Sequence, residues 1–343
     1  MKKILTLILA CLCALAFWGC KGSKPTLHIY VWSDYIAPES IEQFEEKFNC
    51  RVIVDTFDKN EALYAKIKGG AVGYDVLQPS SYMAKVMFDE KMIIPLDKSK
   101  LPNLKYVNPK YLKDSAIDKE MLYSVPYMIC YACVAYDSNK VKDIPQSWSV
   151  FADSRFKGRM TLLDDIHETI GAALKYNGFE LNSVDDAELA KAKETILNWR
   201  KNVAKFDAEA YKTGIATGEF VLVHGYSGDL AQVIAEKPHI KLMFPKEGMS
   251  ISCDDWVIPQ GAKNLDLAYE FINFMTSPEV AVQNMEFSQY DAVNWKAREL
   301  MSDELKNMPT MNIPAEVLEK SEVIKDLGEN NKKRYKLWDE VKL

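Results

Sequence analysis

The sequence is short of several features that mark whole classes of protein. Its 343 residues include 15 glycines and 14 prolines, and 27% are charged, which excludes collagen-like, low-complexity and strongly disordered chains. Acidic residues outnumber basic ones by 49 to 43, so the basic face that a nucleic acid requires is not indicated. Because 48% of the residues are apolar, the chain can build hydrophobic cores for about two domains.

Motifs that bind nucleotides or support hydrolysis are also missing. No G-x-G-x-x-G, G-x-x-x-x-G-K-[ST] or G-x-S-x-G pattern is present, so dinucleotide-binding, P-loop and hydrolase functions have no support. The 4 histidines do not stand at metal-ligand spacing, and His224 fits a half-buried structural role. We therefore expect a protein that is not an enzyme and that holds no metal and no cofactor.

Long hydrophobic runs are confined to the N-terminus. The segment Ile4–Gly19 is apolar and follows two lysines. A membrane-spanning helix needs about 20 apolar residues, so this shorter run predicts a signal peptide over residues 1–19. Gly19 and Cys20, followed by a polar stretch, resemble the processing site of bacterial lipoproteins, in which the cysteine becomes the acylated first residue. We expect lipidation at Cys20 and a periplasmic protein anchored to a bacterial membrane; cleavage after Ala16 is the alternative.

Cysteine is scarce beyond this segment. Cys50, Cys130, Cys133 and Cys253 are too few for a disulfide framework in a chain of this size. Cys130 and Cys133 have the spacing of redox or zinc motifs, but the surrounding strand pattern would point them to opposite faces. No second pair completes a metal site, so we interpret them as structural.

The mature chain shows a regular alternation of strand and helix patterns. Strands are predicted at Leu27–Val31, Val52–Phe57, Tyr74–Leu77, Ser124–Tyr136, Met160–Leu163, Phe220–Val223 and Asp254–Pro259. Helices are predicted over 38–49, 60–68, 167–176, 186–202 and 229–235, and after Asn264. Such alternation is typical of mostly parallel sheets with helices on both faces. Because no flexible linker divides the chain, we predict an α/β fold of two lobes with a cleft between them.

Acidic, aromatic and hydroxyl side chains gather just past these strands, where open α/β sheets bind ligands. The groups are Trp32–Tyr35, Ser80–Tyr82, Asp165 with Glu168, Tyr226–Asp229, Asp254–Trp256 and Tyr290–Asp291. An organic polycation needs carboxylates for its ammonium groups, hydroxyls for its remaining N–H donors and aromatic faces for cation–π contacts. The pattern therefore favours a small polycation as ligand. Asp165 and Glu168 are also compatible with helix capping, and a rival interpretation as an acid/base group with His167 has no nucleophile or cofactor motif to support it.

With these residues identified, the chain resembles the periplasmic polyamine-binding proteins, which are the spermidine and putrescine receptors of ABC importers. The resemblance extends from Leu27 to Lys342 and is carried by strings such as Leu27–Pro38, Leu96–Leu101 and Pro245–Gly248. It implies a two-lobed periplasmic solute-binding protein fold with a ligand cleft. It also implies a first lobe made of residues 26–132 plus 253–307 and a second made of residues 133–252 plus 308–343.

The resemblance further implies a set of polyamine-binding residues. From the first lobe and its crossing strand these are Trp32, Ser33, Asp34, Tyr35, Ser80, Tyr82, Asp254 and Tyr290. From the second lobe they are Asp165, Glu168, Tyr226 and Asp229. The implied partners are a polyamine and the membrane permease and ATPase of an importer, with no nucleic acid.

Two positions depart from the family pattern. Ser252 stands where the family has a second stacking aromatic, and Ile324 replaces a glutamine of the spermidine receptor. The motifs mix spermidine-type and putrescine-type features, so the preferred polyamine stays open. A receptor of the same fold for ferric iron, using tyrosines such as Tyr226, and a polyamine sensor are the alternatives.

Overall fold

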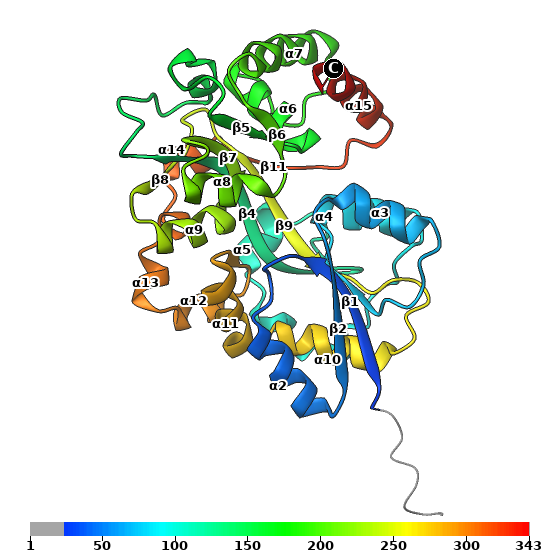
Figure 1. Cartoon of the computed structure of the whole chain (residues 1–343). Helices are drawn as coiled ribbons and strands as arrows, with labels where there is room; N and C mark the ends of the chain where they lie inside the picture. The colour runs from blue at the N-terminus through cyan, green and yellow to red at the C-terminus, as the bar shows by residue number, and fades with distance from the viewer. Residues whose placement is uncertain (1–23, 343) are drawn as a thin grey trace, which may run out of the picture.

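The computed structural model describes residues 24–342 as mixed α/β structure (Figure 1). The predictions for residues 1–19 and Cys20 lie outside the described residues. The strands are β1 (Thr26–Trp32), β2 (Arg51–Phe57), β3 (Val76–Leu77), β4 (Val125–Asp137), β5 (Met160–Leu163), β6 (Lys205–Asp207), β7 (Leu222–Tyr226), β8 (Ile240–Met243), β9 (Ser250–Trp256), β10 (Asp291–Ala292) and β11 (Glu322–Val323). Within the described range, a small parallel sheet has the order β2–β1–β3, and a larger sheet has the order β11–β9–β4–β7–β5–β6, with β8 and β10 also pairing with β4.

Helices cover both sheets. Up to residue 200 they are α2 (Pro38–Phe48), α3 (Asn60–Lys68), α4 (Ser81–Asp89), α5 (Pro109–Asp114), α6 (Ile166–Tyr176) and α7 (Asp186–Arg200). Later come α8 (Ala210–Thr217), α9 (Ser227–Glu236), α10 (Leu265–Met275), α11 (Pro278–Ser288), α12 (Trp295–Leu300), α13 (Asp303–Lys306), α14 (Ala315–Leu318) and α15 (Asn331–Lys342). Short 3₁₀ turns occupy η1 (Lys98–Lys100), η2 (Pro102–Tyr106), η3 (Trp148–Ala152), η4 (Ser154–Phe156), η5 (Pro309–Met311) and η6 (Gly328–Asn330).

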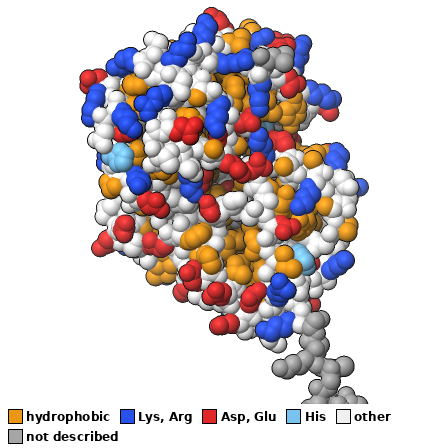
Figure 2. Space-filling model, viewed as in Figure 1, with side chains coloured by type: hydrophobic (Ala, Val, Ile, Leu, Met, Phe, Trp, Pro, Cys, Tyr) orange, Lys and Arg blue, Asp and Glu red, His pale blue; other side chains and the backbone are white. Residues whose placement is uncertain are grey.

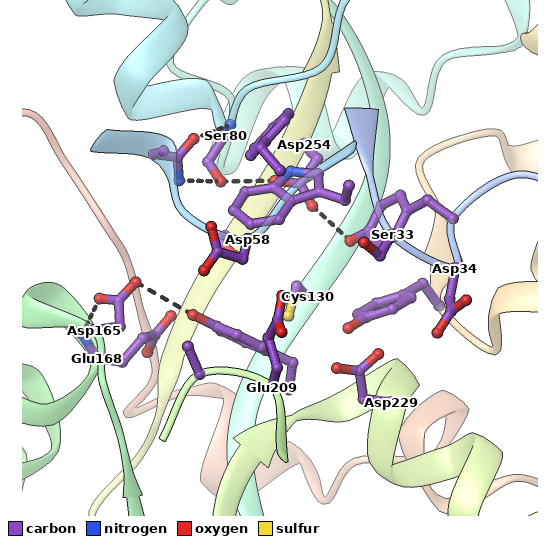
Figure 3. Close-up of a pocket in the computed structure, with 18 of the residues that line it drawn as sticks. Ser33, Asp34, Asp58, Ser80, Cys130, Asp165, Glu168, Glu209, Asp229 and Asp254 are labelled. Atoms are coloured by element: carbon purple, nitrogen blue, oxygen red, sulfur yellow. Dashed lines mark hydrogen bonds between the residues drawn. The ribbon is translucent and has the colours of Figure 1, made fainter. Parts of the chain in front are cut away.

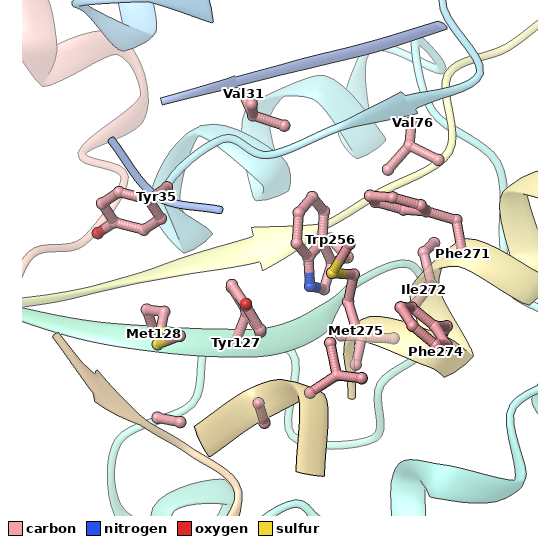
Figure 4. Packing of buried hydrophobic residues seen from close by; sticks show 14 of the residues in the cluster. Val31, Tyr35, Val76, Tyr127, Met128, Trp256, Phe271, Ile272, Phe274 and Met275 are labelled. Atoms are coloured by element: carbon pink, nitrogen blue, oxygen red, sulfur yellow. The ribbon is translucent and has the colours of Figure 1, made fainter. Parts of the chain in front are cut away.

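The central strand β1 of the small sheet is packed on both faces, and its side chains alternate between two cores, whereas β2 at the edge is largely exposed. Ile29 and Val31 join the core formed with α2 and α10, whereas Tyr30 packs with residues of α3 and α4. Figure 4 shows the first of these cores, in which Phe271 and Trp256 lie between the strands and α10. Because both of its faces are packed, β1 is held firmly, and Trp32 at its C-terminal end has a defined position.

The long strand β4 connects the two lobes. Its residues Val125–Tyr131 pair antiparallel with β9, and from Ala132 onward it pairs with β7 and β8. In Figure 1 β4 and β9 run side by side from the lower lobe into the upper one. The second lobe has its own core around Trp148 and Trp199, which also includes Trp338 of the C-terminal α15. The two lobes are thus linked by paired strands and not by a flexible linker.

The predicted alternation of strands and helices is confirmed, with shifts at element ends. The strand expected at Asp254–Pro259 runs from Ser250 to Trp256, because pairing with β4 extends it backward through Ser252. The helix expected from Asp229 begins at Ser227. Asn264 precedes α10 as predicted but does not cap it through its side chain, which donates instead to the backbone oxygen of Thr26. The loop-rich region after Pro95 contains η1 and η2. No sequence pattern predicted the short strands β6, β8, β10 and β11.

Candidate functional site

A cavity of about 310 Å³ lies between the two lobes and is lined by both (Figure 3). Every binding residue expected from the sequence lies in its wall: Trp32, Ser33, Asp34, Tyr35, Ser80, Tyr82, Asp165, Glu168, Tyr226, Asp229, Asp254 and Tyr290. Ser252 and Ile324, the two departures from the family pattern, line it as well. The fold therefore brings together strand ends that are far apart in the chain.

The cavity wall is acidic. Among the described residues that line it, seven carry a carboxyl group and one, Lys212, carries an ammonium group. The acids are Asp34, Asp58, Asp165, Glu168, Glu209, Asp229 and Asp254. Figure 2 shows acidic side chains around the hollow between the lobes. Negative charges that face a confined space attract cations and disfavour anions.

The turn after β1 supplies the first wall. Asp34 adopts a positive φ of 56°, which turns the chain sharply between β1 and α2. The ring of Trp32 packs on Phe57 with centroids 4.4 Å apart, and the ring of Tyr35 packs on Tyr290 at 4.7 Å. Aromatic faces are thus fixed on the cavity wall before any ligand is present.

Asp254 forms the centre of a hydrogen-bond network on the same side of the cavity. Its Oδ2 accepts a 2.5 Å hydrogen bond from the Tyr35 hydroxyl, and its Oδ1 accepts one of 2.7 Å from Ser80. Asn60 in turn donates to the Ser80 hydroxyl at 3.0 Å. Burial raises the pKa of Asp254 to about 6, and the hydrogen bonds from Tyr35 and Ser80 oppose that rise.

The second lobe contributes the start of α6. Asp165 caps this helix, because its Oδ1 accepts from the backbone N–H groups of His167 at 2.8 Å and Glu168 at 3.0 Å. Its Oδ2 accepts a 3.2 Å hydrogen bond from the Tyr226 hydroxyl. Helix capping and a place in the cavity wall are therefore compatible roles for this residue.

Glu168 lies one turn along the same helix and is only 4% exposed. The hydroxyl of Ser250 donates to its carboxylate. Burial and the nearby Asp165 carboxylate raise the pKa of Glu168 to about 8, and the bond from Ser250 opposes this. With this pKa, Glu168 is mostly protonated at pH 7.

The opposite side of the cavity is built around Asp229. Its Oδ2 accepts a 2.6 Å hydrogen bond from the Tyr211 hydroxyl, and burial raises its pKa. Gly228, its neighbour in α9, lies against Tyr290 of the other lobe, and a Cβ there would be 2.2 Å from the ring. The absence of a side chain at Gly228 lets the two lobes approach closely here.

The structure does not arrange Asp165, His167 and Glu168 as an acid/base group, which the sequence had left as an alternative. The His167 ring makes no hydrogen bond through Nδ1 to any described residue, and it packs against Tyr82 with centroids 4.8 Å apart. Burial lowers the pKa of His167 to about 4, so the imidazole is neutral at pH 7. Its contact with Asp165 is made by the backbone N–H and not by the ring.

Several lining residues were missed by the sequence analysis, among them Asp58, Asn60, Cys130, Glu209 and Lys212. Asp58 and Asn60 directly follow β2, so the same strand-end rule could have found them. Glu209 and Lys212 follow the three-residue β6, which has no recognisable pattern. Cys130, in the middle of β4, was interpreted as structural, and its position in the cavity wall was not predicted. Cys50, Cys130, Cys133 and Cys253 are all buried and form no disulfide within the described range.

Comparison with known proteins agrees with this architecture. Residues 39–313 match the family described as bacterial extracellular solute-binding protein. The chain belongs to this family. The predicted solute-binding fold is thereby confirmed, and the names of similar proteins confirm the resemblance to polyamine receptors. In the described part of the chain, no helix is long and apolar enough to cross a membrane.

The relatives carry consistent names. The putrescine/cadaverine-binding protein of Pseudomonas aeruginosa is 32% identical, with 100% of this chain and 99% of that protein covered. Among solved structures, the spermidine/putrescine ABC transporter substrate-binding protein PotD of Streptococcus pneumoniae has a TM-score of 0.81 and 32% identity, covering 93% of this chain and 98% of that one. The TpPotD lipoprotein of Treponema pallidum has a TM-score of 0.84 and 29% identity, covering 92% and 99%. Further relatives are named putrescine-binding and spermidine/putrescine-binding periplasmic proteins, and these names denote binding proteins rather than enzymes.

Proposed function

We propose that this solute-binding protein is a polyamine receptor that delivers its ligand to the permease and ATPase of an ABC importer, without catalysis. The observation that carries the proposal is the cavity wall, in which carboxyl groups surround a space that is also lined by aromatic rings. The names of the similar putrescine- and spermidine-binding proteins support the same ligand class.

The recognition chemistry follows from the positions of these groups. We assign ammonium binding to carboxylates at both sides of the cavity and to Asp254 between them, and cation–π contacts to Trp32, Tyr35 and Tyr290. Several carboxylates around one cavity make the ligand-free state costly, since like charges face one another. A ligand with two or three positive charges relieves more of this repulsion than a monoamine does, so monoamines bind poorly.

We further propose that the lobes close over the ligand by bending at the crossing strands. The lobe boundaries predicted from the sequence, after residues 132, 252 and 307, stay part of this proposal. The change of strand partner on β4 at Ala132 supports the first boundary. Closure removes water from the cavity, and the lower local dielectric strengthens each ammonium–carboxylate contact.

The alternative of a ferric receptor is less well supported. Iron binding through tyrosine needs phenolates, but burial, together with Asp165 and Glu168, raises the pKa of Tyr226, and its hydroxyl donates to Asp165. No group of three or more histidine, cysteine, aspartate or glutamate side chains is placed to hold a metal ion in residues 24–342. A sensor would use the same cavity, and we favour import because of the transporter named in the similar structure.

The N-terminal segment fits an anchored receptor. We propose that residues 1–19 are removed as a signal peptide and that Cys20 is acylated, so that the protein is anchored to a bacterial membrane in the periplasm. The similar Treponema pallidum protein is named a lipoprotein, which supports this. β1 begins at Thr26, so only a short tether would separate the anchor from the first lobe.

Thermal unfolding with a panel of ligands tests the function. A ligand that binds only the folded state raises the unfolding temperature, and the rise grows with the logarithm of the ratio of ligand concentration to Kd. We expect putrescine, cadaverine, spermidine or spermine to raise it, with butylamine and ferric citrate having little effect. A shift with ferric citrate alone would overturn the proposal in favour of the iron receptor.

A further inference from the structure

Lys212 places a positive charge in the otherwise acidic wall. It lies in α8 of the second lobe, and its Nζ is 2.9 Å from Oδ2 of Asp34 in the first lobe. The same ammonium group donates a 2.7 Å hydrogen bond to Oε1 of Gln232, which comes from α9. Two polar contacts therefore hold it at one side of the cavity, and one of them crosses between the lobes.

This position divides the acidic wall into two parts. Figure 3 shows Asp165 and Glu168 at one side of the cavity and Asp34 and Asp229 at the other. Lys212 pairs with Asp34, and its charge also opposes the burial that raises the pKa of Asp229. Within the described lining, the Asp165–Glu168 side has no cation of its own.

Building on the polyamine-binding function above, we propose that Lys212 acts as an internal cation that occupies the Asp34–Asp229 side and thereby sets the ligand's length and charge. A diamine can place its ammonium groups near Asp254 and near Asp165 with Glu168, away from Lys212. A triamine must bring its third ammonium group toward Lys212 or displace the lysine from Asp34. Lys212 therefore favours a diamine over a triamine.

The exposure of the pair determines how strong this discrimination is. The Lys212 side chain is 25% exposed and that of Asp34 is 60% exposed, so the ion pair lies at the mouth of the cavity. Exposed ion pairs contribute little, and the lysine can swing into solvent at modest cost. The selectivity is therefore graded, and the triamine is disfavoured rather than excluded.

Calorimetric titration of Lys212→Met with putrescine and spermidine tests the proposal. The variant keeps the length of the side chain but removes its charge, so the ratio of spermidine to putrescine affinity should rise by roughly fivefold or more over wild type. Lys212→Arg, which keeps the charge, should retain the wild-type ratio. Thermal unfolding of each variant confirms that it is folded.

Lys59→Met is the matched control. Lys59 also forms an ion pair between the lobes, with its Nζ 2.8 Å from Asp164, but it does not line the cavity. The Lys59→Met variant therefore measures the general effect of removing one positive charge near the cleft. Its ratio of spermidine to putrescine affinity should change less than that of Lys212→Met. An unchanged ratio in Lys212→Met, or an equal change in Lys59→Met, overturns the role of Lys212. Absence of any amine binding by wild type would instead overturn the polyamine function itself.

Discussion

The hydroxyl of Tyr35 donates a 2.5 Å hydrogen bond to Asp254, and this contact joins the turn after β1 to the strand β9 that crosses between the lobes. The carboxylate is held on its other oxygen by Ser80. Its orientation is therefore fixed before a ligand arrives, which lowers the entropic cost of binding. An aromatic ring and a carboxylate are presented together, as an alkylammonium ligand requires.

Removing a buried carboxylate should weaken binding far more than folding. We predict that Glu168→Ala or Asp254→Ala loses roughly 2–5 kcal/mol of polyamine binding, about 30-fold or more in affinity, because a desolvated ammonium group loses its partner. Titration calorimetry gives the affinity, and thermal unfolding gives the stability. Normal binding by both variants would show that the cavity assignment is wrong.

Asp255 offers the matched control for these variants. It neighbours Asp254 and is equally buried, but it accepts hydrogen bonds from Ser81 and Ser124 and does not line the cavity. Asp255→Asn should lower the unfolding temperature while leaving affinity within about twofold of wild type. A large loss of affinity in this variant would mean that the losses at Asp254 report general disruption.

Binding should depend on pH in a defined direction. The raised pKa values of Glu168, about 8, and Asp254, about 6, leave protons on the empty cavity that a cation must displace. Affinity is therefore lowest at acid pH and rises through pH 8, where Glu168 is half ionised, with protons released on binding near pH 7. Above about pH 9 the affinity stops rising, because the ammonium groups of the ligand, which resemble that of lysine, begin to lose their protons. Titrations in buffers of different ionisation enthalpy measure this release. A flat profile with no release would contradict the ionisation states assigned here.

The two departures from the family pattern should affect selectivity. Ser252→Trp adds an aromatic face, for which cation–π estimates run from about 0.5 to 2 kcal/mol, and Ile324→Gln restores a polar group for an amine. We predict that the double variant gains spermidine affinity relative to putrescine, because the longer triamine reaches the added polar corner. Competition titrations of the double variant and of each single variant measure how much each substitution contributes to the change in selectivity. A shift toward putrescine would mean that the polyamine lies differently in the cavity.

The lipid anchor has a direct test. We predict that the native protein partitions into the detergent phase and that Cys20→Ala does not, because acylation requires the cysteine thiol. Mass spectrometry of the N-terminus identifies the cleavage site in the same samples. Equal behaviour of the two proteins, with cleavage after Ala16, would instead indicate a freely soluble receptor.

The parts of the site that could be predicted from sequence are those set by local patterns. Trp32–Tyr35 follows a clear strand, and Asp165 stands between a strand and a helix, so their place at a sheet edge is expected. Lys212 could not be found in this way, because its contact with Asp34 depends on how the two lobes sit together. Cys130 lies within β4, where alternation alone does not show which face meets the cavity.

The most direct test of the account is calorimetric titration of the mature protein with putrescine, spermidine and spermine, with butylamine as the monoamine control. We predict one molecule of polyamine bound per chain, with an affinity at least about a hundredfold above that of butylamine, since each further ammonium–carboxylate contact in the closed cavity adds to binding. Equal and weak binding of all four amines would contradict the claim that this cavity recognises a polycation.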